Sequence, residues 1–120
     1  MKMVYGGPHY TNGKPCNTLS PEETGGSWTN TGVVYINQDM NSVMKYYGIK
    51  DSVEYFTKII MAHELAHEVY NNIATESFKN KIVNEAKSKK FHTIYLDHVK
   101  GEKLHQETFC EYMAYLIIDK

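Results

Sequence analysis

The sequence predicts a small α+β domain with a central helix, a short mixed or antiparallel sheet and a C-terminal helix that carries two carboxylates. Three observations predict this class. Residues 1–32 are rich in Gly, Pro, Asn, Thr and Ser, a composition typical of turns and short strands. The run Val33–Asn37 is β-branched and aromatic, which predicts a strand in a short mixed or antiparallel sheet. Later residues repeat apolar side chains at helical spacing, which predicts helices.

The chain has 120 residues, which is enough for one domain spanning residues 1–120, with an irregular segment at 1–32. Its content of 42% hydrophobic and 22% charged residues excludes wholesale disorder. The net charge of -1 does not favour a nucleic-acid partner. We also expect no membrane span, because no run of about 20 apolar residues occurs.

The first residues contain no apolar stretch of signal-peptide length. We therefore expect a cytoplasmic protein, or a secreted one if this chain is a mature or excised domain. Cys16 and Cys110 allow one disulfide at most, and whether they pair is left open.

Four helices are predicted from periodicity and end signals: 41–47 ending at Gly48, about 53 to 70 or 71, 74–89, and 104–118. Asp51 or Ser52 is the expected N-cap of the second helix. Between the last two helices, 91–96 is expected to be a strand or an extended loop, and Gly101 to mark a turn.

The second helix is apolar on two sides, which predicts a central, buried position. One side carries Phe56, Ile59, Ile60, His63, His67 and Tyr70, and the other Met61, Leu65 and Val69. The final helix is expected to bury Phe109, Met113, Leu116 and Ile117.

The middle of the second helix reads His63-Glu64-Leu65-Ala66-His67, an H-E-x-x-H motif. Four residues make about one helical turn, so both imidazoles lie on one face and can reach a single zinc ion. Glu64 flanks that position, where a carboxylate can act as general base. The alternative is a pair of hydrogen-bonded core histidines, but buried polar groups without partners are destabilising, which favours the metal.

A catalytic zinc site needs a third protein ligand and one open position. The extended motif H-E-x-x-H-x-x-G-x-x-H is excluded, because Tyr70 and Ile73 occupy the positions of its glycine and third histidine. Glu107 and Glu111 share one face of the final helix. Like charges at this spacing repel, unless one binds a cation and the other bonds a ligand histidine. The alternative is a solvated acidic face.

His63-Glu64-x-x-His67 followed by Glu107-x-x-x-Glu111 resembles the gluzincin metallopeptidases. The stretch ETFCEYM at 107–113 is most similar to the anthrax lethal-factor-type catalytic domain and the clostridial Pro-Pro endopeptidases. The resemblance covers the second half of the chain. It implies a zincin-like fold and a zinc-dependent endopeptidase that acts on a peptide or protein substrate with one Zn²⁺. It also implies that His63, His67 and Glu107 are the ligands, that Glu64 is the base, and that Glu111 supports the site.

The related enzymes carry an oxyanion-stabilising tyrosine about two turns before the glutamate ligand. Lys100 occupies that position here, and the nearest upstream tyrosine is Tyr95. We therefore expect Tyr95 to be the oxyanion donor, with His98 and His105 as other candidates. A purely structural Tyr95, in a strand of the core, is the alternative.

Enzymes of this class also hold substrate as an added strand at a sheet edge. The resemblance implies that role for Val33–Asn37, with 25–28 forming the rim; a plain sheet strand is the alternative. Two other functions stay open: an intracellular regulator-cleaving metallopeptidase of phage or mobile-element type, and a non-catalytic zinc-stabilised binding domain. Glu64 argues against the last, because a structural zinc site does not need a base.

Overall fold

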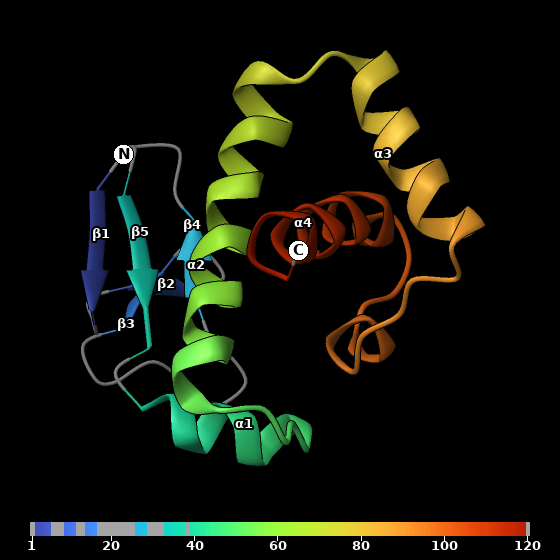
Figure 1. The fold of residues 1–120 in the computed structure, drawn as a ribbon. Helices are drawn as coiled ribbons and strands as arrows, with labels where there is room; N and C mark the ends of the chain where they lie inside the picture. The colour runs from blue at the N-terminus through green and yellow to red at the C-terminus, as the bar shows by residue number, and fades with distance from the viewer. Residues whose placement is uncertain are drawn as a thin grey trace.

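A long helix, α2 (Val53–Glu68), lies between a small sheet and a second long helix, α4 (Lys103–Ile118) (Figure 1). This computed structural model describes residues 2–5, 9–11, 14–16, 26–28, 33–37 and 39–119. Helices dominate this part of the chain, and none of the described helices has the length and apolar character needed to span a membrane. The domain is therefore α-rich, and the predicted α+β class fits it loosely.

The sheet is mixed and its strands are short. β5 (Val33–Ile36) pairs in parallel with β1 (Lys2–Tyr5) and antiparallel with β4 (Gly26–Trp28), in the order β1-β5-β4. A separate antiparallel pair joins β2 (His9–Thr11) and β3 (Lys14–Cys16). The predicted strand at Val33–Asn37 is confirmed, and its place in the centre of the sheet explains its β-branched composition.

Helix ends follow the signals in the sequence. α1 (Met40–Tyr47) begins after Asp39, whose side chain accepts a hydrogen bond from the Ser42 amide, and stops at Gly48 in the left-handed conformation, with φ of 72°. Ser52 is the N-cap of α2, because its hydroxyl oxygen accepts a hydrogen bond from the amide of Tyr55. Both predicted helices therefore form within a residue or two of their expected starts.

Two segments differ from the prediction. The α-helical part of α2 ends at Glu68 and continues as a π-helical turn, η1 (Val69–Ile73). No strand forms at 91–96: Phe91 to Thr93 are irregular, and a 3-10 turn, η2 (Tyr95–His98), follows. The strand alternative for this segment was wrong, because the chain turns there to lead α3 (Glu76–Ser88) into α4.

Two apolar clusters lie on either side of α2. The first joins α2, α3 and α4 through Ala66, Ile82, Val83, Ala86, Phe109, Cys110 and Tyr112. The second joins the sheet, α1 and α2 through Val34, Ile36, Met40, Val43, Met44 and Phe56. The helix is thus central, as predicted. Leu65, however, is 41% exposed and Ile117 is 58% exposed, so the outer edges of α2 and α4 are not covered.

Small side chains set how closely α2 approaches α4. Ala62 and Ala66 on α2 and Ala114 on α4 are all buried, and Ala114 has no exposed surface. Ala62 and Ala114 share a cluster with Ile59. Alanines at a helix crossing let the two backbones come close, so polar side chains one turn away can meet between the helices.

We expect Ala114→Leu to lower the free energy of unfolding by about 1–3 kcal/mol, because the extra carbons overfill a packed contact. Urea titration measures this. The matched control is Ile117→Leu on the exposed edge of the same helix, which we expect to change stability by less than about 0.5 kcal/mol. Equal stability of the two variants would contradict the described packing.

Candidate metal centre

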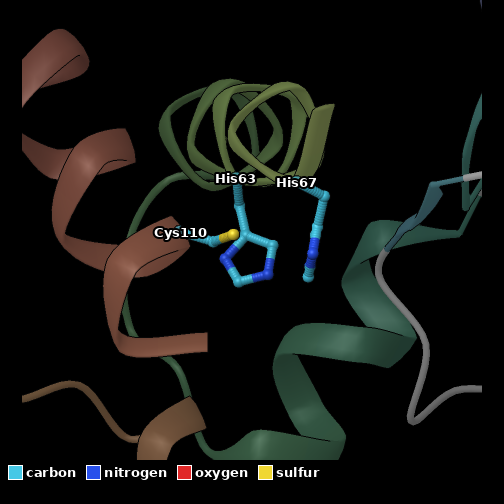
Figure 2. A group of neighbouring side chains, drawn as sticks. All are labelled: His63, His67 and Cys110. Carbon is cyan, nitrogen blue, oxygen red and sulfur yellow. The ribbon is translucent and has the colours of Figure 1, made fainter. Parts of the chain in front are cut away.

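The two histidines of the H-E-x-x-H motif project from one face of α2 toward α4 (Figure 2). Their ring centroids lie 5.0 Å apart. His63 is only 3% exposed, and His67 is partly buried. The one-turn spacing in the sequence therefore produces the paired imidazoles that it predicted.

His63 is oriented by a carboxylate from α4. Its Nδ1 lies 2.6 Å from Oε2 of Glu111, and the other oxygen of Glu111 accepts a hydrogen bond of 2.9 Å from the Thr93 hydroxyl. A carboxylate only accepts hydrogen bonds when ionised, so Nδ1 of His63 carries the proton. The lone pair of neutral His63 then lies on Nε2, the atom that faces away from Glu111.

His67 is oriented in the same way by an amide. Its Nδ1 lies 2.7 Å from Oε1 of Gln106, and that oxygen also accepts a hydrogen bond of 2.8 Å from Asn71. Asn71 is fixed in turn, because its amide also donates to the backbone oxygen of His67. Nδ1–H of His67 therefore donates to Gln106, which leaves the lone pair on Nε2. Such bonding of the outer nitrogen fixes the tautomer that metal-binding histidines require.

Glu107 brings a carboxylate oxygen against both Nε2 atoms. Oε2 of Glu107 lies 2.9 Å from Nε2 of His63 and 3.4 Å from Nε2 of His67. This oxygen is buried and has no hydrogen-bond partner among the described residues. Ligand atoms bound tetrahedrally at about 2.0–2.1 Å lie about 3.3 Å from one another. Both distances from Glu107 are therefore close to the separation of ligands that share one small cation.

The charges also favour a cation. Glu64, Glu107 and Glu111 place three carboxylates around two imidazoles in a buried cluster. Burial acts to raise the pKa of Glu107, but the two imidazoles hold it well below its usual range. Burial acts to lower the pKa of His63, but the carboxylates of Glu107 and Glu111 raise it. A buried group of anions needs positive charge nearby. Without a metal, protonated imidazoles supply it; a divalent cation would replace those protons, so these residues fit zinc.

Cys110 lies next to the centre and was not among the predicted site residues. It is a free, buried thiol, and its sulfur is within 4.8 Å of ligand nitrogens of His63 and His67. Figure 2 shows the sulfur beside the His63 ring. The described residues thus offer two candidates for a third ligand, Cys110 and Glu107, whose Oε2 lies 2.9 Å and 3.4 Å from the two Nε2 atoms. Burial and the neighbouring carboxylates raise the pKa of the Cys110 thiol, so without a metal it keeps its proton.

Glu64 lies beside the imidazoles, under strand β4. Its side chain is 6% exposed, and Oε2 is 3.9 Å from Nε2 of His63. Burial raises its pKa above the usual carboxylate value. A Cβ on Gly26 would lie 2.8 Å from Cγ of Glu64 and 2.9 Å from Cγ2 of Ile60. Glycine at position 26 therefore lets the strand lie directly on the predicted base.

A cavity of about 370 Å³ opens onto this cluster, and Glu64, Glu107, Gly26 and Tyr95 are among the residues that line it. The Tyr95 ring centroid lies 5.5 Å from that of His63. Burial, together with nearby carboxylates, raises the pKa of the Tyr95 phenol, so its O–H proton is retained. Tyr95 thus lies in η2 at the cavity wall rather than in a core strand.

The other two oxyanion candidates lie in different places. His98 lines the same cavity. His105 is turned away toward α3 and η1, where its ring nitrogens bond the Tyr70 hydroxyl at 2.8 Å and Asn80 at 3.1 Å.

The strand expected to receive substrate is not an edge. β5 is bonded to β1 on one side and to β4 on the other, so Val33–Asn37 has no free edge for an added strand. Among the described strands of this sheet, β4 (Gly26–Trp28) is the edge that contacts α2. β4 belongs to the segment that was expected to form the rim of the site. It is therefore β4, and not Val33–Asn37, that offers an edge beside α2 for an added strand.

Three polar partners were missed: Gln106, Thr93 and Asn71. Gln106 could have been found from the sequence. If Glu111 lies opposite His63, a residue about one turn earlier on α4 should lie opposite His67. Thr93 could not have been found, since it comes from an irregular segment whose path depends on the whole fold. Asn71 depends on the π-helical turn, which the periodicity did not indicate.

No protein-family model, curated protein or solved structure matches this chain. The resemblance to gluzincins thus depends on the motif residues alone, and the assignments that it implies enter below as proposals.

We expect Glu111→Gln to weaken zinc binding by about 10–100-fold, because His63 loses the carboxylate that orients it. Competition with a chromogenic chelator measures the dissociation constant. Glu102→Gln, at the exposed start of the same helix, is the matched control and should leave the constant unchanged. Unchanged affinity in Glu111→Gln would show that this contact does not support a metal.

Proposed function

We propose that this chain is a zinc-dependent endopeptidase with a zincin-like fold, in which His63, His67 and Glu107 hold the metal. The observation that carries the proposal is the buried Oε2 of Glu107, which lies against both Nε2 atoms without a hydrogen-bond partner among the described residues. The resemblance of the two-part motif to gluzincins supports the same ligand set.

A bound zinc ion supplies Lewis acidity, which lowers the pKa of water and polarises a carbonyl. The chain supplies proton transfer. Glu64 lies at the cavity wall with its pKa raised by burial, so it can accept a proton from the attacking water and pass it to the leaving amine. Glu111 and Gln106 keep the two imidazoles in the required tautomer.

Tyr95 is the proposed oxyanion donor. Its ring is beside His63 at the cavity wall, and its phenol keeps its proton. A hydrogen bond aimed at the developing oxyanion stabilises the transition state more than the bound substrate. In this proposal β4 receives an extended peptide by backbone pairing, which places the scissile carbonyl near Tyr95.

The alternatives use the same residues differently. A regulator-cleaving metallopeptidase would share the whole site and differ only in its protein substrate. A zinc-stabilised binding domain would keep the three ligands without needing a carboxylate at the position of Glu64. The buried Glu64 beside a cavity favours catalysis.

We expect Glu64→Gln to bind one zinc ion per chain and to cleave peptides about 10²–10⁴-fold more slowly, because only the base is removed. Metal analysis and sequencing of products from a mixed peptide library measure the two properties. The matched control is Glu54→Gln, at the exposed start of the same helix. Wild-type cleavage by Glu64→Gln would overturn the mechanism, and a zinc-loaded wild type that cleaves nothing would favour the binding domain.

We expect Tyr95→Phe to lower kcat by about 10²–10³-fold with little change in KM, because the lost hydrogen bond forms mainly in the transition state. Steady-state kinetics measure both constants. Tyr46→Phe, a half-exposed position on α1 outside the cavity lining, is the control. A changed KM with constant kcat would assign Tyr95 to substrate binding instead.

A further inference from the structure

The cavity beside the metal centre has two chemically different walls. α1, α2 and the turn between them supply the apolar wall, which consists of Val43, Tyr47, Ile49, Phe56, Ile59 and Ile60. The segment from η2 into the first turn of α4 supplies the other wall, with His98, Val99, Lys100 and Lys103. Positive charge is thus confined to one side of the centre.

The two lysines of that wall are not used elsewhere in the described structure. Both are exposed, and neither has an ion-pair partner among the described residues. Lys103 is one helical turn before Glu107, a spacing at which the two could pair. The Glu107 carboxylate is turned to the imidazoles instead, which leaves the Lys103 ammonium available to another anion.

We propose that Lys100 and Lys103 are specificity-determining residues that select substrates with a carboxylate close to the cleaved bond. This inference rests on the proposed peptidase function and names the substrate class of that site. The carboxylate comes either from an Asp or Glu side chain or from the C-terminus of the substrate. Both lysines are exposed, so their ammonium groups attract the carboxylate through a charge interaction that salt partly screens.

The rest of the site makes the lysines necessary for such a substrate. When ionised, the carboxylates of Glu64, Glu107 and Glu111 carry three negative charges, of which a divalent cation would offset two. A substrate carboxylate would therefore meet net repulsion without Lys100 and Lys103. On the apolar wall a carboxylate would lose hydration without a partner, which is unfavourable. A substrate carboxylate is therefore favoured only at the wall that carries Lys100 and Lys103.

The test uses the zinc-loaded full chain and sets of acetylated hexapeptides. Members of a pair differ only by Glu or Gln at one position and end in an amide. A third version of each peptide has Gln and a free C-terminal carboxylate, which separates the two sources of the charge. We expect the charged peptide to be cleaved with a kcat/KM at least about tenfold higher than that of its neutral counterpart. The charge that gives this preference is either a Glu at one position of the peptide or the free C-terminus.

We expect Lys100→Gln/Lys103→Gln to reduce this preference to less than about threefold. The matched control is Lys81→Gln/Lys87→Gln, which removes the same charge from exposed positions of α3 outside the cavity lining and should keep the full preference. Equal cleavage of charged and neutral peptides by the wild type would overturn the inference and leave the peptidase proposal standing.

A binding measurement decides the inference even if no peptide is cleaved. Calorimetry on zinc-loaded Glu64→Gln should give tighter binding of the charged peptide, and high salt should weaken that difference because the lysines are exposed. Selective binding without cleavage by the wild type would refute the proposed function and keep the carboxylate site. Equal binding of both peptides, or a preference that persists in the double lysine variant, would refute the carboxylate site.

Discussion

The close crossing of α2 and α4 is the constraint on which the rest of the molecule depends. Buried alanines on both helices allow that approach. It places Oε2 of Glu107 within 2.9 Å and 3.4 Å of the Nε2 atoms of His63 and His67. The sheet lies on one side of α2, and α3 and α4 lie on the other (Figure 1). Both imidazoles project from the same face of α2 (Figure 2).

Polar side chains of α4 serve two purposes at that crossing. Glu111 and Gln106 bond the outer nitrogens of the histidines and fix their tautomers, whereas Glu107 approaches the inner nitrogens and finds no hydrogen bond there among the described residues. A buried carboxylate oxygen that faces two imidazole nitrogens without a hydrogen bond is costly unless a proton or a cation lies between them. A cation between the helices would remove that cost, and it would also link the stability of the crossing to metal binding.

The sequence predicted the parts of this arrangement that depend on local spacing. The imidazole pair follows from H-E-x-x-H on a helix, and the positions of Glu107 and Glu111 follow from a four-residue spacing on the final helix. The helix ends followed from Ser52 and Gly48. Other parts depend on tertiary packing, so periodicity could not supply them. These include the contacts of Thr93 and Cys110, the central position of β5, and the exposure of Leu65, a residue that looks buried by its pattern alone.

The identity of the third ligand tests the account most directly, because Glu107 and Cys110 both lie beside the two histidines. Zinc K-edge X-ray absorption on the full chain, loaded with one equivalent of zinc, distinguishes them by atom type. We expect a first shell of nitrogen and oxygen at about 2.0–2.1 Å, with the outer-shell scattering of two imidazoles and no sulfur. A sulfur shell at about 2.3 Å, or scattering from fewer than two imidazoles, would contradict the account.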